Sequence, residues 1–242
     1  MRVFEIDAKV LDSFPETDVG LIAAYGIDNS VAWPEVDEMA RVMESDIADG
    51  TWSPFEETDP AIASWHETFR RFGTNPRRSR SSLDALSRRV AKTGRVPRIN
   101  PAVDAYNLTS MRFGTPSGAF DANQLDGLVR LRFAGDNESF SPLGVPESVE
   151  FARPGEVIYS DESRVLTRHW NHRDCDQTKV TSDSRCVIFV LERIAKGAVS
   201  DHEFVLAQDS LSRILAPRSL GLFRSALNAD SPVALLPDPF GS

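Results

Sequence analysis

The residues from His169 to Thr181 place many chemically capable side chains within a short stretch. The run HWNHRDCDQTKVT holds two imidazoles, two carboxylates, a thiol, two amides, a guanidinium, an ammonium and two hydroxyls. Imidazoles titrate near neutral pH, and a carboxylate can orient water or bind an ammonium group, so these groups could serve a hydrolytic site. The candidate catalytic residues are His172, Asp174, Asp176 and Lys179.

The same run admits other interpretations. His169, His172 and Cys175 recur every three residues, and with Asp174 or Asp176 they could present nitrogen, sulfur and oxygen to a zinc ion. Strong zinc patterns pair two such clusters, whereas the other imidazoles, His66 and His202, are distant in sequence. A thiol nucleophile would need a base within reach, and a polar hairpin would explain the run without any chemistry. We therefore expect no metal and no cofactor.

Basic residues gather in one part of an acidic chain. The net charge is −9, yet the segment from Arg70 to Arg98 contains ten basic residues and one acidic residue, Asp84. Such asymmetry is typical of a surface for a polyanion, although a solvated helix face with carboxylate partners would look the same. The candidate RNA-contacting residues are Arg77, Arg78, Arg80, Arg88, Arg89 and Lys92.

Composition indicates a globular chain. Its 242 residues are 41% hydrophobic and 26% charged, which allows a sizeable core. The first residues lack the pattern of a signal peptide, and no apolar run approaches the roughly 18 residues of a membrane span. Cys175 and Cys186 do not suggest a disulfide framework. We expect a cytoplasmic protein without a membrane partner.

Hydrophobic periodicity and turn residues predict the order of elements. His66 lies beside the apolar stripe of a predicted helix and is expected to be structural. Residues 95–127, rich in proline and glycine, are expected to form tight turns between short elements, and the tail from Pro232 onward is expected to be loosely held. Strands are predicted at 2–10, 19–27, 128–134, 149–153, 156–160 and 185–193, and helices at 34–47, 60–73, 83–94 and 201–215.

Residues 100–127, NPAVDAYNLTSMRFGTPSGAFDANQLDG, resemble the B3/B4 domain of the phenylalanyl-tRNA synthetase beta subunit. The resemblance continues in order through 128–134, 140–144, 156–161, 169–181 and 185–192, and the flanking segments are more similar to free-standing B3/B4 proteins. The matching residues in the first segment are Val103, Asp104, Asn107, Gly114, Pro116, Ala119, Phe120, Asp121 and Leu125.

This resemblance implies an α+β fold: a B3/B4-like sheet sandwich flanked by helices, with a pocket between its halves and a helical N-terminal extension. We expect residues 1–242 to form a single domain. Within it, 1–75 would hold N-terminal strands and helices, 76–195 the B3/B4 motifs, and 196–242 a C-terminal helix and tail.

In the synthetase this domain hydrolyses the ester of wrongly charged tRNA, and free-standing relatives are thought to do so in trans, including for fluorothreonine. The expected function is therefore an aminoacyl-tRNA deacylase, with aminoacyl-tRNA and not DNA as partner. Gly118 stands where the synthetase has a histidine, so its specificity for aromatic substrates does not carry over, and an acidic residue of its pocket aligns near Asp176. The candidate substrate-binding residues are Asn107, Ser117, Gly118, Phe120, Asp121, His169, Trp170, Asn171, Thr178 and Thr181.

Two other functions stay open at this point. A noncatalytic RNA-binding module would bind tRNA with strong salt dependence and hydrolyse nothing, because function resides in sites and not in folds. A hydrolase of small esters or amides would be insensitive to loss of the arginines. The base could be a histidine or the ribose hydroxyl of the substrate.

Overall fold

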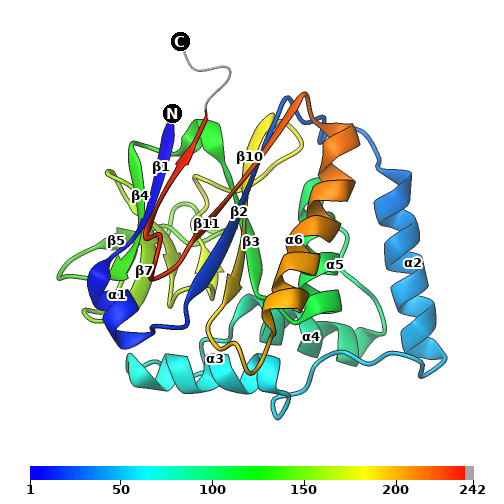
Figure 1. Cartoon of the computed structure of the whole chain (residues 1–242), viewed down its shortest axis with the longest axis horizontal. Coiled ribbons are helices and arrows are strands. Elements are labelled where there is room, and N and C mark those ends of the chain that lie inside the picture. The colour runs from blue at the N-terminus through cyan, green and yellow to red at the C-terminus, as the bar shows by residue number, and fades with distance from the viewer. Residues whose placement is uncertain (238–242) are drawn as a thin grey trace.

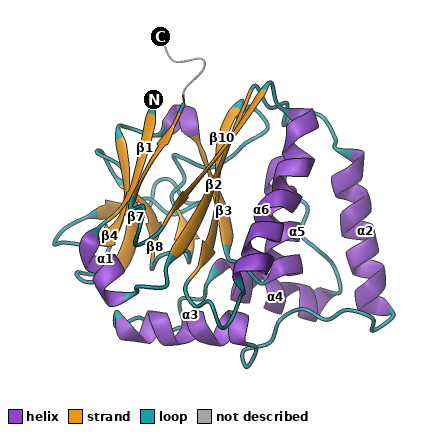
Figure 2. Ribbon diagram, viewed as in Figure 1, coloured by secondary structure: helices purple, strands orange, loops and turns teal. Residues whose placement is uncertain are grey.

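Two β-sheets face each other, and helices cover the outer face of one of them, in the computed structural model, which describes residues 1–237 (Figure 1). Figure 2 shows the layers in order: the sheet that holds β1 and β4, the sheet that holds β2 and β10, and then the helices. The predicted α+β class, with a sheet sandwich flanked by helices, is confirmed.

The first sheet has six strands in the order β12-β1-β4-β7-β8-β9. Its neighbours are antiparallel except for β1 and β4, which are parallel. The strands are β1 (Arg2–Ile6), β4 (Leu128–Phe133), β7 (Val157–Ser160), β8 (Val165–Arg168), β9 (Arg173–Asp174) and β12 (Val233–Leu236).

The second sheet has four strands in the order β11-β2-β10-β3, all antiparallel to their neighbours. A further two-stranded ribbon pairs β5 with β6. The strands are β2 (Asp18–Tyr25), β3 (Ser117–Asp121), β10 (Cys186–Arg193), β11 (Gly221–Leu227), β5 (Ser139–Phe140) and β6 (Glu150–Phe151).

Alternation along β2 builds two separate cores. Val19, Leu21 and Ala23 belong to the cluster between the sheets, whereas Ile22 and Ala24 belong to the cluster under the helices. Successive side chains of a strand point to opposite faces, so one strand supplies both clusters. Strand β10 is likewise buried over its whole length because each of its faces is covered.

The helices begin at residues with clear capping chemistry. The Ser81 side chain accepts a hydrogen bond from the Asp84 amide at the start of α4, and Asn100 caps α5 in the same way. The helices are α1 (Ala8–Ser13), α2 (Pro34–Ala48), α3 (Pro60–Arg71), α4 (Ser82–Thr93), α5 (Pro101–Phe113) and α6 (Asp201–Leu215), with 3₁₀ turns η1 (Ala122–Gln124) and η2 (Ala216–Arg218).

Three sequence-based predictions are corrected by the structure. The strand predicted at 2–10 stops at Ile6, because Asp7 caps α1. Residues 95–127 contain the long helix α5, which Asn100 caps and Pro101 begins. The tail from Pro232 is not loose throughout, because Val233–Leu236 pairs with β1; its residues 238–242 lie outside the described part.

The other predicted helices and strands are present, although one strand is shorter than predicted and several further strands were not predicted. The helices predicted at 34–47, 60–73, 83–94 and 201–215 correspond to α2, α3, α4 and α6. The strand predicted at 149–153 shortens to the two residues of β6. Strands β3, β5, β8, β9, β11 and β12 were not predicted. The N-terminal segment supplies β1 and β2 to the two sheets in addition to its helices.

His66 joins α3 to α4. Its ring is buried, and Nε2 lies 2.9 Å from a carboxylate oxygen of the buried Asp84. Its Nδ1 lies 3.7 Å from Glu57. This environment supports the structural role expected for His66.

Among the helices of residues 1–237, none combines the length and the apolar composition that a membrane span requires.

Candidate active site

A small cavity lies between the two sheets, where β3 and β10 of one sheet meet β7, β8 and β9 of the other. Its volume is about 60 Å³, which is room for a few water molecules. The start of α4 and the turn between β8 and β9 complete its wall. Polar groups that line it include Ser82, Asn171, His172, Asp174 and Glu192.

The turn between β8 and β9 is held in an unusual conformation. His169 and Trp170 both adopt left-handed backbone angles, with φ of 47° and 68°. Such angles cost about 1–2 kcal/mol for a residue other than glycine. The Trp170 ring offsets this cost, because it is fully buried and packs edge-on against Phe14 and Trp65, at ring-centre distances of 5.4 and 5.3 Å. The turn therefore presents Asn171 and His172 to the cavity.

Glu192 is the most deeply buried acidic group of the cavity. Its Oε1 accepts hydrogen bonds from the Tyr159 hydroxyl at 2.6 Å and the Trp170 indole at 2.8 Å, and its Oε2 accepts one from the Asn171 amide at 2.7 Å. Burial raises the pKa of Glu192 to about 7, against the lowering effect of these donors. Sequence reasoning missed Glu192 as a site residue.

Asp174 also lines the cavity. No hydrogen bond or ion pair of its carboxylate is recorded within residues 1–237, although its backbone oxygen binds the amide of Leu143. Burial raises the pKa of Asp174 to about 6. The cavity thus contains two carboxyl groups that titrate near neutral pH.

The ring of His172 is held so that Nδ1 donates a hydrogen bond and Nε2 can accept a proton. Its Nδ1 lies 2.8 Å from the backbone oxygen of Arg80, which can only accept, so Nδ1 carries the proton. Burial lowers the pKa of His172, and the ring is therefore neutral at pH 7. No hydrogen bond of its Nε2 is recorded within residues 1–237, so this nitrogen keeps the lone pair that a general base requires.

Five of the candidate substrate-binding residues line the cavity: Ser117, Gly118, Phe120, Trp170 and Asn171. Gly118 stands beside Val190 in the register of β3 and β10. A Cβ built on Gly118 would meet no atom within 4 Å, so this part of the wall is open.

Asp176 and Lys179, two candidate catalytic residues, do not line the cavity. Their side chains pair with each other at 2.7 Å, and Asp176 also accepts a hydrogen bond from the Gly144 amide at 2.9 Å. These contacts lower the pKa of Asp176, the Lys179 bond having the largest effect. Both groups therefore stabilise the loop after β9.

The remaining candidate substrate-binding residues also lie outside the cavity lining. Asp121 accepts a hydrogen bond from Ser184 at 2.6 Å, and Thr178 contacts the Cys175 sulfur at 3.0 Å. The Thr181 hydroxyl accepts a hydrogen bond from a backbone amide, and Asn107 is a half-buried residue of α5.

His169 faces away from the cavity. Its Nδ1 lies 2.9 Å from the Thr74 hydroxyl and 3.1 Å from the buried carboxylate of Glu156. Burial lowers the pKa of His169 to about 4. Within residues 1–237, no three His, Cys, Asp or Glu side chains gather as metal ligands, so His169, His172 and Cys175 do not form the zinc arrangement considered above.

The basic segment divides between a groove and structural contacts. Arg88, Arg89 and Lys92 lie on the exposed face of α4 and line an open groove of about 980 Å³ opposite residues 53–57. Phe55 lies in the groove among these cations, together with two glutamates.

The other candidate RNA-contacting residues are arranged differently. Arg77 pairs with Glu57 at 3.3 Å while staying largely exposed. Arg78 is exposed, and the partly buried Arg80 lies 3.5 Å from Asp84. The cations most available to a polyanion are therefore those of the α4 face and Arg78.

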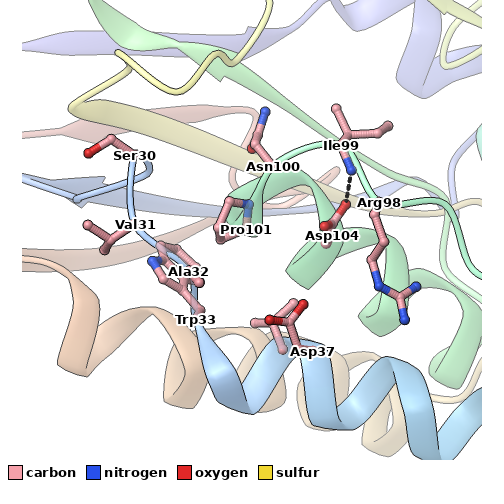
Figure 3. Close-up of a pocket in the computed structure, with 11 residues that line it drawn as sticks. Ser30, Val31, Ala32, Trp33, Asp37, Arg98, Ile99, Asn100, Pro101 and Asp104 are labelled. Atoms are coloured by element: carbon pink, nitrogen blue, oxygen red, sulfur yellow. Dashed lines mark hydrogen bonds between the residues drawn. The ribbon is translucent and has the colours of Figure 1, made fainter.

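A second hollow of about 290 Å³ lies between the starts of α2 and α5 (Figure 3). Asp104 points to the backbone of Ile99 and accepts its amide at 2.8 Å. The side-chain oxygen of Asn100 accepts hydrogen bonds from the Val103 amide at the start of α5 and from the side-chain amide of Asn29. Because these polar groups hold the helix start, and no imidazole or thiol within residues 1–237 lines this hollow, the cavity between the sheets is the better candidate site.

This protein is a two-sheet sandwich with helices on one face. The cavity between its sheets contains acidic groups and an imidazole. Residues 64–222 match the family model of the B3/4 domain, and the chain belongs to that family. The resemblance seen in the sequence is thereby confirmed.

Two proteins similar to the chain are phenylalanyl-tRNA synthetase beta subunits. The one from Colwellia psychrerythraea is 34% identical over 68 residues, which are 28% of this chain and 8% of that protein. The chain thus corresponds to a small part of this curated relative. The other is the crystal structure of an N-terminal fragment of the beta subunit from Pyrococcus horikoshii. The match spans 91% of this chain and 49% of the crystallised chain, with 14% identity and a TM-score of 0.45.

Proposed function

We propose that this chain is a trans-editing deacylase that hydrolyses the ester bond of a mischarged aminoacyl-tRNA. The observation that carries the proposal is the neutral imidazole of His172, held in one tautomer beside two titratable carboxyl groups in a B3/4-domain cavity. The tRNA link comes from the synthetase beta subunit named above, which shares part of its sequence with this chain.

The chemistry follows from the direction in which His172 can move a proton. Water adds to the ester carbonyl carbon while its proton passes to Nε2 of His172. The bond between that carbon and the ribose oxygen then breaks, and the ribose oxygen takes the proton back. The free ribose hydroxyl of the substrate can assist, so no covalent enzyme intermediate is needed. The products are a free amino acid and uncharged tRNA.

The polyanionic part of the substrate would lie on the exposed face of α4. Arg88, Arg89 and Lys92 share this face, and α4 begins at Ser82 in the cavity wall. One helix therefore joins the groove to the cavity. Phosphates held along α4 would direct the terminal ester toward its N-terminal end, with Arg78 as a further exposed contact.

The small cavity favours a compact amino-acid side chain. A side chain such as that of threonine or fluorothreonine suits a volume of about 60 Å³ better than a large aromatic ring. Binding alone separates such near-isosteric amino acids by only about 100-fold, so a second hydrolytic site is the way to remove the wrong one.

The test is deacylation of a panel of purified aminoacyl-tRNAs, correct and mischarged, including fluorothreonyl-tRNA, at low salt with and without a chelator. Rapid, chelator-resistant clearance of one species is expected. If the protein binds tRNA but clears no ester faster than buffer, the noncatalytic RNA-binding alternative replaces the proposal. Clearance that a chelator abolishes would contradict the metal-free mechanism.

A further inference from the structure

The cavity holds more hydrogen-bond acceptors than donors. The Asn171 side-chain oxygen is buried and has no hydrogen-bond partner within residues 1–237, while its amide nitrogen donates to Glu192. The Asp174 carboxylate has no recorded partner within residues 1–237, and Oε2 of Glu192 accepts a single recorded bond. A carboxylate oxygen has room for about two donors.

No lysine or arginine within residues 1–237 binds these acceptors. Neither lysine nor arginine lines the cavity. The nearest guanidinium groups in sequence are committed elsewhere: Arg173 binds Glu150, and Arg168 binds both Glu150 and Glu156. The Nδ1–H group of His172 donates its hydrogen bond to the backbone oxygen of Arg80. An acceptor left unpaired in such a cavity is destabilising, and a ligand with several donors would pair with it.

We propose that Asp174, Glu192 and the side-chain oxygen of Asn171 form a subsite for a primary ammonium group, the α-ammonium of the aminoacyl ester. This inference rests on the proposed function and names what the site recognises. An –NH₃⁺ group has three donors and no acceptor, which matches three acceptors from three different elements. The pairing also neutralises charge that the cavity otherwise carries alone.

The subsite has a consequence for substrate choice. An aminoacyl-tRNA whose amine is acylated has lost the charge and two donors, and it adds bulk in the cavity that the three acceptors line. Peptidyl-tRNA and N-acylated aminoacyl-tRNA are therefore poor substrates, while free-amine esters are hydrolysed. This selectivity spares chains under synthesis and acts only on newly charged tRNA.

A binding measurement separates this inference from the catalytic proposal. Threoninamide has the ammonium group but no ester, and its 2-hydroxy counterpart is a matched neutral control. Binding is followed by NMR through the indole N–H of Trp170, which lies in the cavity wall. Threoninamide is expected to bind about tenfold or more tighter than the hydroxy amide, which is the effect of one hydrogen-bonded charge.

Two variants make the test specific. Asp174→Asn keeps shape and removes the charge, and it should reduce the preference for threoninamide to about threefold or less. Asp183→Asn, an exposed acid outside the cavity lining, should leave the preference unchanged. Equal binding of both amides by the unaltered protein, an Asp174→Asn variant that keeps the full preference, or displacement of threoninamide by millimolar Mg²⁺ would overturn the subsite.

Hydrolysis adds an independent arm. Threonyl-tRNA and N-acetyl-threonyl-tRNA differ only at the amine, and the free-amine species should be cleared at least tenfold faster. If neither ester is cleared while threoninamide still binds through Asp174, the subsite stands and the deacylase proposal fails. If both esters are cleared equally, the deacylase stands and the subsite fails.

Discussion

The backbone oxygen of Arg80 accepts a hydrogen bond from Nδ1 of His172 at 2.8 Å, across 92 positions of sequence. Two residues later the Ser82 amide donates to the backbone oxygen of Asn171 at 3.0 Å. The segment just before α4 therefore fixes the tautomer of the proposed base and the position of its neighbour. Because α4 also carries the exposed cations, one helix borders both the groove and the cavity.

Neutralising the α4 face should weaken tRNA binding without affecting the fold. Replacing Arg88, Arg89 and Lys92 together by alanine removes three exposed charges. The slope of log affinity against log salt should fall by about two to three, since each phosphate contact contributes about 0.9. Filter binding at several salt concentrations measures this slope.

The matched control for that experiment is Arg213→Ala, an exposed arginine on α6. This variant should keep the full salt slope. An unchanged slope in the triple variant would show that the groove does not hold RNA. Loss of hydrolysis of small aminoacyl esters by the triple variant would instead mean that these side chains act on the cavity itself.

Gly118 should set the size of side chain that the cavity accepts. Its backbone is not left-handed, and an added Cβ meets nothing within 4 Å, so Gly118→Ala should fold and be stabilised by about 0.4–1 kcal/mol through the unfolded chain. The methyl group narrows the cavity between Val190 and the opposite sheet. Deacylation of the bulkier accepted substrates should fall severalfold more than that of the smallest.

Gly197→Ala is the control, because that glycine also has open space around its Cβ and lies outside the cavity lining. Relative kcat/KM values across the aminoacyl-tRNA panel are the readout. A Gly118→Ala variant with the same ranking and rates as the unaltered protein would exclude this wall from substrate selection.

The cavity carboxyl groups predict how stability depends on pH. Burial raises the pKa of Asp174 to about 6 and that of Glu192 to about 7, whereas both lie near 4 in an unfolded chain. Between about pH 4 and pH 7 the folded state therefore binds more protons than the unfolded state. Their contribution to the free energy of unfolding is greatest at low pH and declines as pH rises through this window.

Asp174→Asn removes one of these protons, so the loss of stability between pH 5 and pH 8 should become smaller than in the unaltered protein. Urea unfolding at the two pH values measures the difference. Asp183→Asn should show the original loss. An Asp174→Asn variant with an undiminished loss would mean that Asp174 already titrates at its ordinary pKa.

Much of the architecture could be predicted from sequence because its signals are local. Four helices and the buried strands β2 and β10 follow from apolar spacing and caps. The helix α5 was not predicted because the three prolines and three glycines of residues 95–127 suggested tight turns, although Asn100 followed by Pro101 is a capping signal. Edge strands such as β11 were missed because their exposed residues do not alternate with buried ones.

The candidate site could be predicted where its residues fall in short runs of sequence, 117–120 and 169–181. Asn171, His172 and Asp174 come from one run and lie together in the cavity. Asp176 leaves the cavity because the chain after Asp174 pairs at Cys175 with Pro142 and turns outward. In the sequence, Glu192 looks like the polar end of an apolar strand. Because it lies two residues after Val190, it shares the face of Val190, which points toward the other sheet.

The most direct test of the account is single-turnover deacylation of the mischarged tRNA cleared fastest in the panel, by the unaltered protein and by His172→Ala. His202→Ala, an exposed histidine on α6, is the control. The account predicts an active protein, an unchanged control, and a rate about 100- to 10,000-fold lower for His172→Ala, the contribution of a general base. Equal rates for His172→Ala and the unaltered protein, with both folded, would contradict it.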